Sequence, residues 1–131
     1  MRTHWYFFTA LFIFGSWKLS ADPVTYDVTV NTSSISGKRG EGWLSVYSAT
    51  KHGVVGFTEA MNKELGGDGI KSTALCPAFV DTPMTDFVKE HVPADTMIRP
   101  EDVAESVRYL LKLSPACVIP EFMFVRPGDA L

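Results

Sequence analysis

Three β-branched stretches alternate with two amphipathic stretches along the chain, and this alternation limits the fold more than any other feature. Composition predicts strands at residues 24–32, 70–76 and 118–125, and apolar residues recur at helical spacing over residues 43–65 and 100–113. Strand, helix, strand, helix, strand is typical of a parallel sheet with helical crossovers, so we predict an α/β fold with three strands. Pro120 predicts an edge or bulged position for the third strand.

The segment between the first strand and the first helix holds three groups suited to proton transfer. Tyr47 and Lys51 are four residues apart, so both side chains leave one face of the predicted helix, one turn apart. Ser34 ends the strand-like run thirteen residues before Tyr47, and a Gly-rich loop can bring the three groups together. A free tyrosine has a pKa of about 10, which an ammonium within roughly 4–6 Å lowers by about one to three units. We therefore predict that Lys51 makes Tyr47 a useful acid–base, while Ser34 hydrogen-bonds a reacting carbonyl oxygen.

The residues around this trio resemble the short-chain dehydrogenase/reductase family. The stretch reads N-T-S-S at the end of a strand, and Y-S-A-T-K-H-G-V-V-G-F-T begins thirteen residues after the second Ser. In that family the second Ser, the Tyr and the Lys are catalytic, and they correspond here to Ser34, Tyr47 and Lys51. The resemblance implies an NAD(P)-dependent oxidoreductase that interconverts a carbonyl and an alcohol on a small molecule, with Lys51 also contacting the cofactor ribose.

The loop after the second strand, P-A-F-V-D-T, is similar to the P-G-x-x-x-T of the family. The resemblance implies that NAD or NADP is bound by Tyr47, Lys51, Pro77, Val80 and Thr82, and the sequence does not decide between the two cofactors. Ala78 replaces the family's Gly, so its backbone is expected to avoid positive φ. Residues 82–99 imply a mobile flap over the substrate. Its apolar side chains suit an acyl-like substrate and a small packing cluster equally well.

Residues 1–23 do not fit this pattern. The apolar run from Trp5 to Phe14 imitates a secretory signal, with small residues near Ala21, but it is too short for a membrane span, which needs about 20 apolar residues. The family's T-G-x-x-x-G-x-G turn is absent before residue 31, and its N-A-G motif occurs nowhere. We therefore expect an atypical apolar segment in place of the dinucleotide-binding half, and a cytoplasmic location, with secretion as the alternative.

Residues 24–131 then form a short-chain dehydrogenase-like partial domain, the C-terminal half of a doubly wound, Rossmann-like parallel sheet. In such a half the strand at 24–32 has a bare edge, which invites association or aggregation. Our hypothesis is that the apolar N-terminal run covers this edge.

The composition excludes some other functions. A net charge of −3 gives no basic footprint for nucleic acid. Cys76 and Cys117 lack the spacing of metal ligands, and their apolar surroundings predict two buried, reduced thiols and no metal site.

Three functions remain open from the sequence. The first is a reductase of the short-chain type that is weak or inactive as this chain alone. The second is a non-catalytic interaction module, because the family's Tyr/Lys helix also packs subunits together; it would form a homo-oligomer or pair with a full-length relative. The third starts from Ser48 to Lys51, which is formally the S-x-x-K of penicillin-binding enzymes, although S-D-N and K-T-G are absent.

Overall fold

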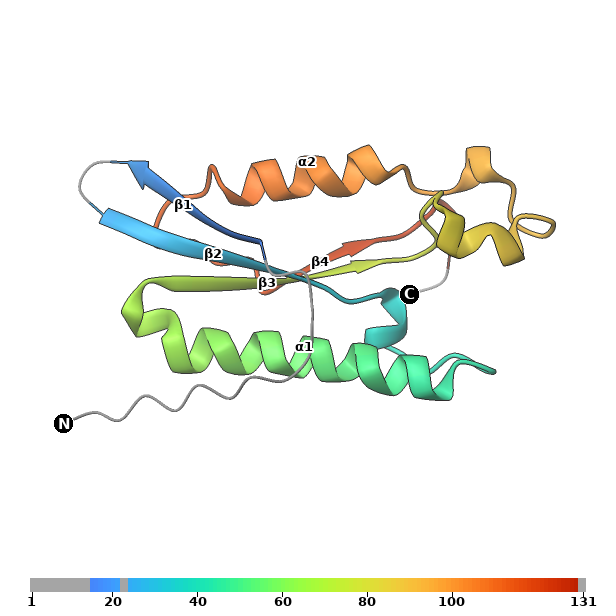
Figure 1. Ribbon diagram of the computed structural model, residues 1–131, viewed down its shortest axis with the longest axis horizontal. Coiled ribbons are helices and arrows are strands. Elements are labelled where there is room, and N and C mark those ends of the chain that lie inside the picture. Colours follow the sequence, from blue (N-terminus) through green and yellow to red (C-terminus); the bar gives the residue numbers. More distant parts are fainter. Residues whose placement is uncertain (1–14, 22–23, 130–131) are drawn as a thin grey trace.

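The computed structural model describes residues 15–21 and 24–129 and arranges them as a four-stranded sheet between two helices (Figure 1). The elements that follow the predicted alternation are β2 (Val24–Thr32), α1 (Ser45–Leu65), β3 (Ile70–Pro77), α2 (Pro100–Leu110) and β4 (Glu121–Phe124). β2 pairs with β3 and β3 with β4, both in parallel. The crossover helix α1 covers one face of the sheet and α2 covers the other (Figure 1). The predicted α/β architecture with three parallel strands is confirmed.

A fourth strand, β1 (Gly15–Ala21), was not predicted. It runs antiparallel to β2 along the edge that β3 leaves open, from Gly15 opposite Val30 to Ala21 opposite Val24. The edge of β2 is therefore paired by residues that follow the apolar run, and the hypothesis that the run itself covers this edge stays a prediction. The run from Trp5 to Phe14 lies outside the described residues. The division of the chain at residue 23 stays a prediction.

Three of the predicted elements were wrong in one or both of their end residues. α1 begins at Ser45 and not at residue 43, because Trp43 has a positive φ of 68° that no helix accepts. α2 ends at Leu110, three residues early. The third strand shrinks to Glu121–Phe124, since Pro120 has no N–H and joins the ladder only through its carbonyl, which accepts from Ala74 N at 2.9 Å.

The loops that follow β2 and β3 lie at the same end of the sheet (Figure 1). The loop after β2 contains the 3₁₀ helix η1 (Ile35–Gly37), and the loop after β3 contains η3 (Pro83–Val88) and η4 (Ala94–Thr96). At the opposite end, η2 (Gly66–Asp68) leads from α1 into β3. The groups predicted to carry the chemistry therefore lie at the carboxyl ends of the parallel strands.

The contact between α1 and the sheet is polar to an unusual degree. Asn31 of β2 donates to Thr58 Oγ1 of α1 at 2.9 Å and to Ser72 Oγ of β3 at 3.1 Å. Asn62 of α1 reaches the main chain of Ser72, accepting from its N–H at 2.7 Å and donating to its carbonyl at 2.7 Å. β4 pairs only with residues 74–77 of β3, so Asn62 supplies the partner that a longer β4 would have given Ser72.

On the α2 face, Tyr26 and Lys71 fix the residues that follow α2. The Tyr26 hydroxyl donates to the carbonyl of Leu113 at 2.5 Å. The Lys71 ammonium lies 4.0 Å from the centroid of the Tyr26 ring and donates to the carbonyl of Ser114. Burial lowers the pKa of Lys71. These contacts tie the end of α2 to β2 and β3.

The apolar core is small. Val55 of α1 packs with Ala74 and Cys76 of β3, and Cys76 is 0% exposed. Cys117 is only partly buried, so the prediction of a buried thiol holds for Cys76 and is wrong for Cys117; neither forms a disulfide. Across residues 15–21 and 24–129 there is no His, Cys, Asp and Glu cluster fit to hold a metal, and no helix with the length and hydropathy to cross a membrane.

Replacing Asn62 by Leu tests whether the polar layer holds α1 in place. The substitution leaves the buried N–H and carbonyl of Ser72 without partners, so we expect the free energy of unfolding to fall by about 2–4 kcal/mol. Denaturant unfolding followed by circular dichroism measures this. Lys63→Leu is the control, because its side chain is exposed and pairs only with Glu59; equal losses in the two variants would contradict the assignment.

Candidate active site

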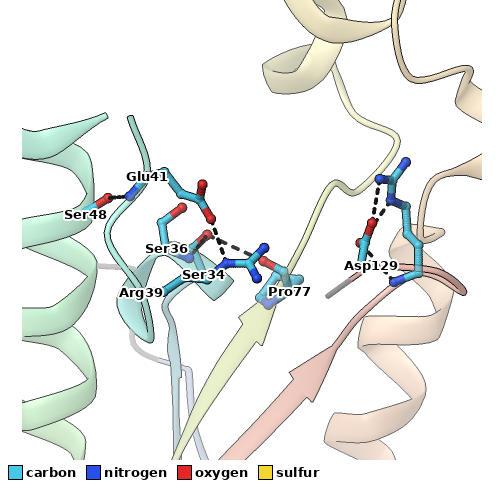
Figure 2. Close-up of polar contacts among 8 residues, drawn as sticks. Ser34, Ser36, Arg39, Glu41, Ser48, Pro77 and Asp129 are labelled. Carbon is cyan, nitrogen blue, oxygen red and sulfur yellow. Dashed lines mark hydrogen bonds and ion pairs between the residues drawn. The ribbon is translucent and has the colours of Figure 1, made fainter. Parts of the chain in front are cut away.

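Ser34 stands at the junction of β2, η1 and the end of β3. It is the N-cap of η1, and its Oγ accepts from Ser36 N at 3.1 Å. The same hydroxyl lies 3.5 Å from the carbonyl of Pro77, to which it donates (Figure 2). Ser34 is 8% exposed. Its oxygen is thus fixed by local turn geometry next to Pro77, another predicted site residue.

Tyr47 and Lys51 lie on successive turns of α1, as their spacing predicted. The Lys51 Nζ is 5.5 Å from the centroid of the Tyr47 ring. It donates to the carbonyl of Thr32, the last residue of β2, at 3.1 Å. Burial lowers the pKa of Lys51, and the nearby Cys76 opposes this to a smaller degree. Lys51 therefore links the phenol to the strand end, two residues before Ser34.

The structure places Lys51 beside the Tyr47 ring and bonds it to Thr32, but among the described residues no hydrogen bond joins Ser34 to Lys51 or to Tyr47. Within the described part of the chain the Tyr47 hydroxyl forms no hydrogen bond, and the side chain is partly exposed. An open phenol beside a partly buried amine can exchange a proton with a bound molecule. The catalytic roles of Ser34, Tyr47 and Lys51 stay predictions.

A close contact between η1 and α1 sets the position of Lys51, and the sequence did not reveal it. The Ser33 hydroxyl donates to the main-chain carbonyl of Lys51 at 2.9 Å. A Cβ at Gly37 would lie 2.7 Å from that carbonyl oxygen and 2.5 Å from Ser33 Oγ. Only glycine fits at position 37 without moving the helix. The only sequence signal was that Ser33 precedes Ser34.

The loop after β3 carries the predicted cofactor residues. Ala78 does not adopt positive φ, as predicted, and its N–H donates to the carbonyl of Phe124 at 2.9 Å. Val80 forms a parallel β-bridge with Ile98. This bridge brings together the two ends of the predicted flap, residues 82–99. The Val80 carbonyl accepts from Thr85 Oγ1 at 2.7 Å and lies 3.5 Å from the hydroxyl of Thr82. Val80 and Thr82 are thus adjacent, and Thr85, which no motif had indicated, joins them.

Ion pairs surround this end of the sheet. Lys38 joins the end of η1 to Glu121 of β4 at 2.8 Å. Arg39 pairs with Glu41 at 2.8 Å (Figure 2). The Arg126 guanidinium donates to the Asp129 carboxylate at 2.7 and 3.1 Å and the Arg126 N–H donates to it at 3.2 Å, and this pairing lowers the pKa of Asp129. None of these pairs was predicted: Lys38 and Glu121 are far apart in the sequence, whereas the other two pairs join residues two or three positions apart.

The residues present fit one end of a nicotinamide dinucleotide. An ammonium has three N–H donors, and in the described part of the chain the Lys51 ammonium forms one hydrogen bond, to Thr32. The N–H of Val80 forms none with any described residue. Ribose hydroxyls and an amide would suit these donors. The Gly-rich turn that cradles a pyrophosphate has no counterpart in residues 24–129.

The interpretation of Ser48 to Lys51 as the S-x-x-K motif of penicillin-binding enzymes finds no support in the geometry. Ser48 is buried, and its hydroxyl accepts from Glu41 N at 3.2 Å (Figure 2). A buried, hydrogen-bonded Ser48 does not suit the nucleophile of a penicillin-binding enzyme.

Comparison with known proteins gives a consistent result. The model of the short chain dehydrogenase family matches residues 27–93. The chain is 30% identical over 109 residues to 3-oxoacyl-(acyl-carrier-protein) reductase FabG of Chlamydia trachomatis, a match that covers 77% of this chain and 44% of the relative. It is 39% identical over 89 residues to human (3R)-3-hydroxyacyl-CoA dehydrogenase, covering 62% of this chain and 34% of the relative.

Solved structures agree with this result. A variant of actinorhodin polyketide ketoreductase with NADPH superposes with a TM-score of 0.65 at 36% identity, covering 73% of this chain and 44% of that one. A 4-hydroxyisoleucine dehydrogenase complexed with NADH gives a TM-score of 0.62 at 26% identity, covering 74% and 44%. The chain spans less than half the length of each of these proteins. On the family match, the sheet topology and these likenesses, the chain belongs to the short-chain dehydrogenase/reductase family, whose cofactor is NAD or NADP.

Proposed function

We propose that this chain carries the acid–base part of an NAD(P)-dependent oxidoreductase that interconverts a carbonyl and an alcohol. One observation supports the proposal most. The Lys51 amine, partly withdrawn from water, stands between the Tyr47 ring and the carbonyl of Thr32, at the strand end that carries Ser34. Because the chain belongs to this family, the interconversion of a carbonyl and an alcohol is the reaction that best suits this arrangement of groups.

Each of the three residues has a distinct task in the proposal. The Tyr47 hydroxyl gives a proton to the substrate oxygen in reduction and accepts it in oxidation. Ser34 Oγ donates a hydrogen bond to that oxygen as charge develops on it. Lys51 places its positive charge beside the Tyr47 ring, whose centroid lies 5.5 Å from the Lys51 Nζ.

NAD or NADP would be held by Tyr47, Lys51, Pro77, Val80 and Thr82. When bound, the nicotinamide supplies the hydride chemistry. Lys51 would donate to the ribose, and Val80 would offer its N–H. The Thr85 hydroxyl that occupies the Val80 carbonyl helps to hold this loop in shape.

The substrate class that we propose is a small carbonyl or alcohol compound with an apolar, acyl-like chain. The names of the reductases from Chlamydia trachomatis and of the human dehydrogenase refer to oxoacyl and hydroxyacyl groups. In this chain, Met84 and Phe87 of η3 are 75% and 72% exposed beside the site, where an acyl chain would cover them. A cytoplasmic location stays a prediction.

We further propose that the 131-residue chain alone is weak or inactive. It spans less than half the length of the relatives compared above, and residues 24–129 offer no Gly-rich turn for the pyrophosphate. Binding energy from that part of a dinucleotide would be missing, and with it the positioning of the nicotinamide.

Titration with NADH and NADPH tests the weakness of this binding. We expect a dissociation constant above about 100 μM for both, which corresponds to roughly −5.5 kcal/mol. Isothermal titration calorimetry of the whole chain measures it, with Lys51→Met as a variant that should bind still more weakly and Lys63→Met as its exposed control on α1. A micromolar constant for the unmodified chain would show that the proposed weakness is wrong.

Replacing Tyr47 by Phe tests the acid–base. Removal of the hydroxyl should lower any NADPH-dependent reduction of an acyl ketone by about 10²- to 10⁴-fold, while the circular dichroism spectrum stays the same. The rate is measured at high protein concentration by product analysis. Tyr109→Phe, on the exposed face of α2, should leave the rate unchanged. Turnover that survives in Tyr47→Phe would remove this phenol from the mechanism.

A second function, a non-catalytic module that forms a homo-oligomer or pairs with a full-length relative, is favoured by the start of α1. Trp43 is fully exposed, and Val46 one turn later is 77% exposed. Apolar side chains at this density on one helix end suit an interface between chains.

Val46→Glu tests this interface. If α1 joins two chains, a carboxylate at position 46 should raise the dissociation constant of the dimer by at least about tenfold, because a charge would be buried. Sedimentation equilibrium measures the association, with Tyr109→Glu as a control at an exposed apolar position on α2. Identical sedimentation of the unmodified chain and Val46→Glu as dimers would rule out this surface.

A further inference from the structure

Three consecutive residues at the end of β2 each make a different contact with the site. The carbonyl of Thr32 accepts from the Lys51 Nζ at 3.1 Å. The hydroxyl of Ser33 donates to the main-chain carbonyl of Lys51 at 2.9 Å. Ser34 turns the other way, toward the end of β3. Lys51 is therefore held twice, once by its side chain and once by its backbone, by residues adjacent to Ser34.

Ser33 is held in place by the residues around it. It is buried, and its N–H donates to the carbonyl of Leu75 at 2.8 Å, so β3 holds its backbone. Gly37 packs against both its hydroxyl and the Lys51 carbonyl, which leaves no room for either to move. Inside a helix the carbonyl of residue 51 already has a partner at residue 55, so the bond from Ser33 is an addition that the helix itself does not need.

We propose that Ser33 is a positioning residue, which fixes the turn of α1 that carries Lys51 at a set distance from Ser34 and so places the amine for the proton transfer. The role of Ser33 in catalysis rests on the proposed function, whereas its role in holding α1 rests on the geometry alone. Ser33 touches neither substrate nor cofactor in this scheme. It acts through the Lys51 backbone.

The proposal predicts how Lys51 responds when the contact is removed. Burial depresses the pKa of Lys51, and Tyr47 from α1 and Cys76 from β3 are the titratable groups that bear on it. Without the Ser33 hydroxyl, the turn is free to move away from the strand end, and water reaches the amine. The pKa of Lys51 should then rise toward its ordinary value.

The experiment compares the whole chain with Ser33→Ala, using lysine labelled with ¹³C at Cε and NMR titration, with Lys51→Met to assign the signal. Ser36→Ala is the matched control, because Ser36 is similarly buried in η1 and, among the described residues, its hydroxyl forms no hydrogen bond to α1. Ser33→Thr keeps the hydroxyl and should restore the unmodified titration. Where Ser33→Ala does not fold, Gly37→Ala presses the same two groups apart and should shift Lys51 in the same direction.

An unchanged Lys51 pKa in Ser33→Ala, or an equal shift in Ser36→Ala, would overturn the proposal. The titration needs no turnover, so it gives an answer even if the chain proves inactive and the proposed function fails. Where turnover is measurable, Ser33→Ala should lower kcat by about tenfold and leave KM near its original value, because positioning of the amine matters in the transition state.

Discussion

The close approach of η1 to α1 is the constraint on which the rest of the site depends. A strand, a turn and a helix meet where Gly37 has no side chain, and the backbone carbonyl of Lys51 occupies the space that a Cβ would need. Because the two elements touch there, the hydroxyl of Ser33 can reach the helix and the amine of Lys51 can reach the strand. A single added carbon would separate the phenol and amine from the strand end that carries Ser34.

The polar contacts between α1 and the sheet also help to position the site residues on α1. An apolar helix face can slide or rotate on a sheet at small cost, whereas hydrogen bonds have defined directions and lengths. Asn31, Thr58 and Asn62 bond across this layer and so fix the rotation and register of α1. The Oδ1 of Asn31 is buried without a partner among the described residues, which is a cost that the fold carries for this arrangement. The register of α1 in turn decides where Tyr47 and Lys51 stand.

Family membership and catalytic competence are separate matters for this chain. The strand end, the Tyr/Lys helix and the loop after β3 all lie in the part that matches the family model, so the proposed acid–base residues stand within it. Cofactor affinity depends on more than these groups, because most of a dinucleotide extends away from the nicotinamide.

The sequence by itself determined the order of the predicted elements and indicated the family, while the site residues that it proposes stay predictions. Periodicity locates β2, α1, β3 and α2 to within a few residues, since hydrophobic spacing is a local property that burial of one face imposes. The spacing of Tyr47 and Lys51 on one helix face is local for the same reason. Only the tertiary structure decided the remaining features: β1 on the open edge, Asn62 on Ser72, Thr85 on Val80, and Ser33 on Lys51. Each of these joins groups from different elements, and a hydrogen bond of about 3 Å between distant segments depends on packing that no local pattern records.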